Sequence, residues 1–561
     1  MKKHITRLLF AALLLLALCI GASAAGTSGK CGPSAYWSFD SSTGTLTISG
    51  SGAMNDYEYG DYPWMDYRNS IQTIVIGDQI TQIGWNAFPW TACSTIKFGK
   101  NVRSIGERAF NGCRNLNGDL TLPDSVQTIG AGAFQGCEKL SGDLTIPDSV
   151  QTIGDSAFEF CTGLNGTLTL GKNLRTIGKK AFSGCAFTGS LTIPEGITEI
   201  AIGTFSSSRS NGMFTGTLTL PSTLKTIGAS AFSYTDFSGE LLIPDGVTSI
   251  GANAFKECDG FGGLLSLPDS VKTVGEWAFY LCKGFTGLKL SAGLTKIEKL
   301  SFAHMYGLRT EVVIPEGVTE IGESAFQCSH MPSICFPSTL KKIGKEAFYF
   351  SLNCKITFPD GLEVIEDEAF ALCNVKSAVI LPASIKSIGK KAFDSDWSYG
   401  KHNDIPLGAY FLGAAPQLVG TGNANCSFPS DWTLNYLPGT SGWMGDTYEG
   451  YQIVPWDGET RWDNLYTDDF GYRDNKWNKI ETSWSVNTDT GKITLTDDLT
   501  EGCAVAVSYD ADGRVTGIGV LRTKTDFVVL NLQDTCRLFL LNASSAPRLN
   551  TPVTINDYLP T

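Results

Sequence analysis

The chain has 561 residues, of which 62 are glycine, and it carries a net charge of −13 at pH 7. That length exceeds a single ordinary domain. The acidic balance argues against nucleic acid or anionic lipid as a partner, because such binding depends on clustered Lys and Arg. Together with a hydrophobic content of 42%, these values predict a turn-rich globular chain of several parts.

The first residues have the pattern of a secretory signal peptide. Basic residues at positions 2, 3 and 7 precede an apolar run from Leu8 to Ile20, and small residues at 22–24 form a cleavage site. We expect cleavage after residue 24 and a secreted, extracellular protein. No later apolar stretch approaches the ~20 residues of a membrane-spanning helix. We therefore expect no membrane insertion after cleavage, and either release or non-covalent retention at the cell surface.

A repeated unit dominates the chain after this segment. An Ile or Val recurs fourteen times from Ile83 to Ile388, and a Phe follows each of them five positions later, from Phe88 to Phe393. The interval is 22 to 24 residues, with one exception of 27. Self-similarity at such a period is typical of solenoid proteins, in which each unit forms one coil.

One unit, residues 144–161, shows how a coil would form. Leu144 and Ile146 alternate with an outward residue, as in a strand with one buried face. Pro147 ends that strand because it lacks an N–H. We expect Gly154 to let the backbone bend on the return path, and Phe158 to fill the coil from a short helical or irregular turn. Stacked coils then share one core, which predicts a β-rich solenoid of 14 repeats with parallel strands.

The repeat Leu-x-Ile-Pro-x-x-Val-x-x-Ile-Gly-x-x-Ala-Phe-x-x-Cys resembles the BspA-like leucine-rich repeat family of secreted and cell-surface bacterial proteins. Residues 37–68, with Trp37, Gly44 to Met54 and Trp64, look like the β-rich lead-in of such proteins, and residues 434–457 look like their closing segment. The resemblance implies a leucine-rich-repeat solenoid with a role in extracellular recognition, adhesion to host or microbial surfaces above all. It implies no defined ligand.

These signals divide the chain into five parts. We expect a signal peptide at 1–24, an N-terminal β cap at 25–70, the solenoid at 71–400, a C-terminal cap at 401–458 and a small β module at 459–561. Caps are needed because the end coils would otherwise expose the core. The last part breaks the period and alternates apolar and polar residues near 492–496, 504–508 and 537–541, which predicts a small antiparallel β-sandwich.

Cysteines form a ladder with the period of the repeat. Cys113, Cys137, Cys161 and Cys185 lie 24 residues apart, and we place Cys258, Cys282, Cys328 and Cys373 at the same position of later units. One cysteine per coil makes a line rather than the tetrahedral cluster of a metal site. We interpret the ladder as buried packing, with disulfides between neighbouring coils geometrically allowed. No metal and no cofactor is expected.

Nothing in the sequence predicts an enzyme. His304 and His330 fall in adjacent units, but no nucleophile elbow or zinc-protease motif accompanies them. Acidic residues recur after the first strand, in one row along a turn rather than as a converging pair. They are Asp124, Asp148, Glu195, Asp245, Asp269, Glu316 and Asp360. We interpret them as turn-forming residues and the protein as non-catalytic.

The binding site that we favour is the outward row, defined as the middle residue of the first strand in each unit. It consists of Lys97, Thr121, Thr145, Thr169, Thr192, Thr219, Leu242, Ser266, Lys289, Val313, Cys335, Thr357 and Ile380. Thr suits a strand in any case, whereas Leu242, Val313 and Ile380 would expose apolar surface. The long unit adds a candidate contact loop at 206–212. The predicted partner is an extracellular protein or a surface polymer.

Two alternatives remain open. Aromatic residues crowd both caps, among them Trp64, Trp443 and Trp456, and exposed rings of this kind would bind a glycan. Caps also need large side chains to cover the core, which explains the same residues by packing. The other alternative is a spacer without a ligand of its own that presents the C-terminal module.

Overall fold

The computed structural model describes residues 27–456, except 208–212, 353–355, 374, 376–378, 395–407, 420–426 and 430–431, and the backbone of seven strands between 484 and 554. The signal peptide and most of the 206–212 loop lie outside these residues. The chain divides into two compact units, Met1–Thr467 and Asp468–Thr561.

The first unit begins with antiparallel strands that lead into the solenoid. Strands β1 (Ser28–Lys30), β2 (Ala35–Asp40) and β3 (Thr45–Gly50) pair in that order. The alternation of buried and exposed residues in β2 places one face on the core. Strand β3 then pairs in parallel with β5 (Thr73–Ile76), and β5 with β7 (Thr95–Lys97), so one sheet joins the cap to the first coils.

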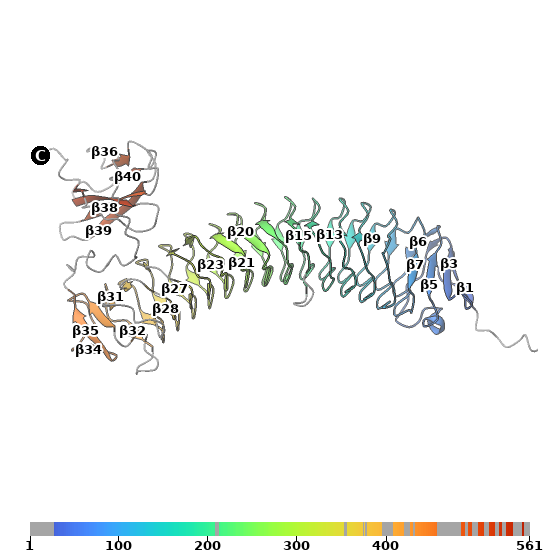
Figure 1. Ribbon diagram of the computed structural model, residues 1–561, viewed down its shortest axis with the longest axis horizontal. Coiled ribbons are helices and arrows are strands. Elements are labelled where there is room, and N and C mark those ends of the chain that lie inside the picture. Colours follow the sequence, from blue (N-terminus) through green and yellow to red (C-terminus); the bar gives the residue numbers. More distant parts are fainter. Residues whose placement is uncertain are drawn as a thin grey trace, which may run out of the picture. The chain divides into compact units, whose positions relative to one another are not determined.

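The first strand of each later coil is short and lies parallel to that of the next coil, as Figure 1 shows. Leu144 pairs with Leu168 and Thr145 with Thr169, so the same repeat positions face one another. These strands are β10 (Leu144–Thr145), β12 (Leu168–Thr169), β14 (Leu191–Thr192), β16 (Leu218–Thr219), β18 (Gly239–Leu242), β20 (Phe261–Ser266), β22 (Phe285–Lys289), β24 (Val312–Val313), β26 (Ile334–Cys335) and β29 (Val379–Leu381).

The return path of each coil carries a second strand, which the sequence pattern alone does not reveal. The repeat Ile points inward while the residue before it points outward, as in Thr152 and Ile153, which pair with Thr176 and Ile177. These strands are β4 (Gly52–Ala53), β6 (Ile80–Ile83), β8 (Ser104–Ile105), β9 (Thr128–Ile129), β11 (Thr152–Ile153), β13 (Thr176–Ile177), β15 (Glu199–Ile200), β17 (Thr226–Ile227), β19 (Ser249–Ile250), β21 (Thr273–Val274), β23 (Lys296–Ile297), β25 (Glu320–Ile321), β27 (Lys342–Ile343), β28 (Val364–Ile365), β30 (Ser387–Ile388) and β32 (Gln417–Leu418).

Parallel stacking continues into the closing segment of the first unit. Strand β29 pairs with β31 (Gly408–Phe411), β31 with β33 (Thr433–Tyr436) and β33 with β35 (Tyr451–Pro455), all in parallel. Strand β34 (Thr447–Tyr448) pairs antiparallel with β35 and ends the sheet. The closing cap is thus built on the same ladder as the repeats.

A column of stacked phenylalanine rings fills the centre of the solenoid. From Phe88 to Phe393, successive repeat rings lie 5.2–5.7 Å apart between centroids, with interplanar angles of at most 18°. Trp64 extends the column at one end, 5.2 Å from Phe88, and Phe428 extends it at the other, 5.3 Å from Phe393. Every ring is buried, so the stack confirms the predicted core.

The turn around each Phe is not helical. Among the described residues the one helix is a 3-10 turn at Met65–Tyr67. Residues two before and two after the Phe adopt left-handed conformations instead, as at Ser156 (φ 55°) and Phe160 (φ 60°). Backbone N–H groups of Ser156, Phe158 and Phe160 thereby donate to carbonyl oxygens of the next coil, each at 2.8 Å. Hydrogen bonds between coils offset the roughly 1–2 kcal/mol that a left-handed L-residue costs.

The prediction that Gly154 supplies a bend is wrong. Its φ is not positive, but a Cβ at this position would lie 2.5 Å from Ala131 N and 2.7 Å from the carbonyl carbon of Gly130. Neighbouring coils approach here backbone to backbone, so the residue must have no side chain. Gly130 and Gly178 meet the coil before them in the same way.

The second unit contains two antiparallel sheets. One consists of β36 (Trp484–Asn487), β37 (Lys492–Leu495) and β40 (Phe527–Val529). The other consists of β39 (Val515–Leu521), β38 (Cys503–Tyr509), β41 (Thr535–Leu541) and β42 (Val553–Thr554). The alternating stretches predicted from the sequence fall on β37, β38 and β41.

Candidate functional site

The side chains of the outward row point away from the core. Eleven of the thirteen positions have exposed side chains, whereas Leu144 and Ile146, the strand neighbours of Thr145, are buried. The exposed positions include Lys97, Thr121, Thr145, Thr169, Thr192, Thr219, Leu242, Lys289, Val313 and Thr357. Cys335 is also exposed, while Ser266 and Ile380 are half-buried. Thr121 and Thr357 lie in extended segments that are not part of an assigned strand.

An aliphatic patch, interrupted by Ser266 and Lys289, occupies the middle of this row. Leu242 is 72% exposed and Val313 is 56% exposed, although both side chains are fully apolar. Leu264, which is 53% exposed, belongs to the same face and was missed in the sequence. A Cβ on Gly287, its partner in β22, would lie 3.0 Å from Leu264 Cδ1, so the leucine lies over that glycine. Leu264 lies two positions before Ser266 in the same strand, so the alternation of outward and inward residues would have identified it in the sequence.

The cysteine ladder is structural and has a polar role as well. Cys137, Cys161 and Cys185 are fully buried, and each thiol donates to a Phe carbonyl oxygen of the preceding coil at 3.0–3.3 Å. Burial raises the pKa of Cys258 to about 12, which keeps its thiol protonated. All described cysteines are free thiols.

Cys328 does not hold the ladder position that we assigned to it. It lies two residues after Phe326, in a left-handed conformation, and it is partly exposed. Ser329 holds the position instead, where its hydroxyl donates to Phe302 O at 2.7 Å. This position requires a buried hydrogen-bond donor that reaches the Phe carbonyl oxygen of the preceding coil. The Ser329 hydroxyl meets that requirement in place of a thiol.

The two histidines lie on the same edge but are separated by Tyr306. His304 Nδ1 lies 2.6 Å from the Tyr306 hydroxyl, and the His330 ring packs 5.6 Å from the Tyr306 ring. Burial, with a smaller contribution from Lys283, lowers the pKa of His304. Within the described part of the chain, no group of three or more His, Cys, Asp or Glu residues is placed to hold a metal ion.

The recurrent acidic residues cap turns of the next coil. Asp148 accepts from the backbone N–H of Lys172 at 3.0 Å, and Glu195 and Glu316 accept from those of Ser222 and Ser338 at 3.0 and 3.1 Å. These bonds lower the pKa of Glu195, because they favour its charged form. The interpretation as turn-forming residues therefore has a geometric basis at these positions.

The tryptophans named as candidate glycan-binding rings are buried in the caps, whereas Tyr59 of the N-terminal cap is 73% exposed. Trp64 is fully buried, and Trp443 and Trp456 are 8% and 6% exposed. Trp443 donates its ring N–H to Gly413 O at 3.2 Å and stacks on Tyr436. Trp462 and Trp477 lie outside the described residues. Trp64, Trp443 and Trp456 thus contribute to the packing of the caps.

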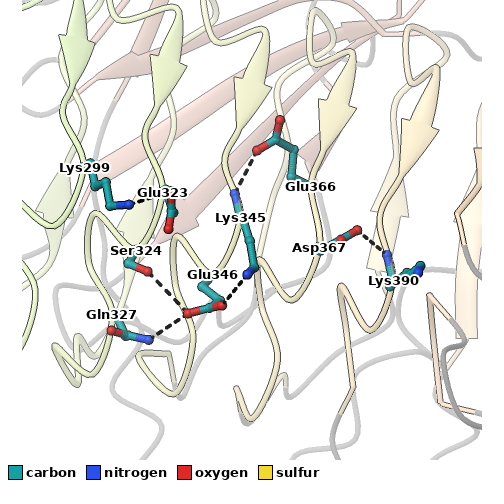
Figure 2. A network of polar contacts seen from close by, with 9 residues as sticks. All are labelled: Lys299, Glu323, Ser324, Gln327, Lys345, Glu346, Glu366, Asp367 and Lys390. Carbon is teal, nitrogen blue, oxygen red and sulfur yellow. Dashed lines mark hydrogen bonds and ion pairs between the residues drawn. The ribbon is translucent and has the colours of Figure 1, made fainter.

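Charged side chains link neighbouring coils at one edge of the later repeats (Figure 2). Glu346 accepts from Gln327 Nε2 at 3.1 Å and from Lys345 Nζ at 3.1 Å, and Lys299 pairs with Glu323 at 2.9 Å. Lys345 and Lys299 remain about half-exposed, and such pairs contribute roughly 0–1 kcal/mol. The Gln327–Glu346 and Lys299–Glu323 contacts join neighbouring coils, whereas Lys345 and Glu346 are adjacent in the chain.

Parallel coils, the Phe column and an exposed strand face define a repeat solenoid of the leucine-rich type. The family model for the BspA type leucine rich repeat region matches residues 65–142, 141–262, 263–374 and 343–401, in six copies. The chain belongs to this family, as the repeat motif predicted.

Several solved structures are similar to the chain. A leucine-rich repeat protein from Bacteroides ovatus is 26% identical, with a TM-score of 0.42, over 56% of this chain and 90% of that one. One from Eubacterium ventriosum is 21% identical, with a TM-score of 0.36, over 68% and 98%. A leucine rich cell surface protein from Faecalibacterium prausnitzii is 23% identical, with a TM-score of 0.32, over 56% and 90%.

No curated protein matches the chain. Among the described residues, no helix is both long and apolar enough to cross a membrane.

Proposed function

We propose that this protein is a non-catalytic, extracellular binding protein whose outward row engages another protein or a surface polymer. The observation that carries the proposal is the exposure of Leu242, Leu264 and Val313 on a regular strand face. Exposed aliphatic side chains that gather on one face mark interaction surfaces. Their strands belong to a stacked core, so the face is rigid and little conformational entropy is lost on binding.

The surroundings of the patch support a protein partner in particular. Lys289 follows Ser266 across the ladder, and Glu311 accepts hydrogen bonds from Ser333 and Cys335 beside Val313. Leu242 and Val313 thus lie on either side of Ser266 and Lys289. Apolar and polar side chains in mixture are the usual composition of a protein interface. An adhesive role at a host or microbial surface is consistent with such a face.

A variant with Leu242→Asp and Val313→Asp tests the proposal. Two carboxylates on the patch would have to lose their hydration on contact, so we expect loss of most binding. The purified protein is immobilised, and extracellular proteins and surface polymers of host and microbial cells are captured from solution. The matched control is Ile202→Asp, an aliphatic side chain that is 47% exposed away from the row.

The proposal predicts partners that the wild type and Ile202→Asp retain and that the double variant loses, with unchanged melting temperatures. Equal capture by all three proteins would contradict it. If the double variant captures the same partners as the wild type, the result would favour the alternative in which the solenoid is a spacer and the C-terminal module binds the partner.

A further inference from the structure

A strip of rings lies on the turns around the core Phe of successive coils. We call it the aromatic strip. It consists of Tyr234, Trp277, Tyr280, His304, Tyr306, His330 and Phe350. Six of these side chains are half-buried and His330 is exposed. They belong to the turns and not to the outward row, so the strip is a feature separate from the proposed protein-binding face.

Lys256 joins the first rings of the strip. Its Nζ lies 4.8 Å from the Trp277 ring centroid, 5.6 Å from that of Tyr280 and 5.8 Å from that of Tyr234. Trp277 and Tyr280 lie 4.6 Å apart. The cation–π contacts fix both the ammonium group and the rings, and they place Lys256 within the strip.

The later rings continue without a break. Tyr280 lies 5.1 Å from His304, His304 and Tyr306 lie 5.6 Å apart, and His330 lies 5.6 Å from Tyr306 and 5.1 Å from Phe350. Neighbouring rings are inclined by 56° to 80°. The strip therefore offers ring faces in alternation with polar ring edges, namely Tyr hydroxyls and His nitrogens.

We propose that the aromatic strip binds a neutral, linear glycan. The strip is narrow and crosses six coils, which at about 4.8 Å per coil is roughly 25 Å. That shape fits one extended polymer chain better than a globular partner, whose footprint is about 800 Å². The C–H faces of a sugar pack on ring faces, and its hydroxyls hydrogen-bond to the polar edges.

The charges beside the strip favour a neutral polymer over an anionic one. Lys283 Nζ pairs with Asp259 at 2.6 Å, and Arg309 donates to the carbonyl oxygens of Tyr306 and Leu308. Lys256 lies over the rings. Each cation already has a partner, whereas a polyanion is bound by cations free to approach it.

Affinity electrophoresis of the full chain tests this proposal, with β-glucan, galactomannan and arabinoxylan as neutral probes and polygalacturonate as the anionic probe. The strip variants are Trp277→Leu and Tyr306→Leu, which remove a ring but keep apolar volume, and Tyr280→Leu replaces either one that fails to fold. Tyr306→Phe keeps the ring. The matched control is Phe160→Leu, because Phe160 is 54% exposed outside the strip.

We expect at least one neutral polymer to retard the wild type, and each strip variant to bind about tenfold more weakly. Phe160→Leu should bind like the wild type, and Tyr306→Phe, which keeps the ring but loses the hydroxyl, should weaken binding less than Tyr306→Leu does. Added salt should have no effect. Equal binding by the strip variants, retardation by polygalacturonate alone, or no retardation by any polymer would overturn the proposal. The Leu242→Asp and Val313→Asp variant should still bind the glycan, which separates this result from the protein-binding experiment.

Discussion

The thiol of Cys161 illustrates how one residue type serves both packing and hydrogen bonding in this solenoid. It is fully buried and donates to Phe134 O at 3.0 Å. Without the donor, that carbonyl oxygen would lose this partner in a site that water does not reach. The left-handed turns align the carbonyl of each Phe with the residue three positions after the next Phe, so the same bond recurs along the stack.

Replacement of Cys161 by Ala should destabilise the protein by about 1–3 kcal/mol, because the Phe134 carbonyl oxygen keeps only the Cys137 N–H as a donor and a small cavity forms. Cys161→Ser keeps a donor and should cost less, since Ser329 makes the equivalent bond. Urea denaturation followed by circular dichroism measures both. A Ser variant as unstable as the Ala variant would show that the volume of sulfur matters and the hydrogen bond does not.

The N-terminal cap shows how an element closes the stack. Trp64 stacks on Phe88 at 5.2 Å, donates its ring N–H to Ala87 O at 2.9 Å and packs edge-on against Trp37 at 5.9 Å. It takes the place of a repeat Phe, so the first coil meets a ring of similar shape instead of solvent. Each coil contacts only its neighbours, which makes the end of the stack the place where unfolding begins.

We expect Trp64→Ala to cost about 3–5 kcal/mol and to unfold the first coils locally. Amide hydrogen exchange should accelerate between β5 and β9 and remain unchanged beyond β17, because stability propagates only through neighbouring coils. Trp85→Ala is the control, since that ring is 52% exposed and its loss should change stability by less than about 0.5 kcal/mol. Uniform acceleration along the chain would mean that the solenoid unfolds as one cooperative unit.

The whole molecule carries a net charge of −13, and two opposing effects govern its response to acid. Lower pH reduces repulsion among carboxylates, which stabilises the fold. His304 and His330 act in the other direction, because burial lowers the pKa of both below the ordinary value of 6.5. At pH values between the lowered and the ordinary pKa, the unfolded chain binds more protons than the folded chain does. The contribution of the two histidines to the free energy of unfolding is therefore fully present above pH 6.5 and is lost as the pH falls through the lowered pKa.

A variant with His304→Gln and His330→Gln separates these effects. Between about pH 7.5 and pH 5.5 the wild type should lose more stability, or gain less, than the double variant does, because only the wild type carries imidazoles whose pKa is lowered in the folded state. Thermal unfolding at the two pH values measures the difference. An identical response of both proteins would show that the histidines titrate in the fold as they do in the unfolded chain.

The sequence alone determined the solenoid, its parallel strands and its Phe column, because each coil repeats the same buried positions and periodicity identifies them directly. It also determined the outward row, since the alternation between Leu144 and Ile146 sets which way Thr145 points. Two predictions from the repeat pattern are wrong. Gly154 is required by the close backbone contact between coils and not by a bend, and Cys328 lies one position before the ladder position, which Ser329 holds.

Only the tertiary structure decided which aromatic residues are buried and which form a surface. Trp443 and Tyr306 are equally plausible as exposed rings in the sequence, yet one is packed in the cap and the other joins the aromatic strip. The members of the strip come from different turn positions and from coils 22 to 24 residues apart. Stacking brings them together, and no spacing within a single repeat predicts that contact.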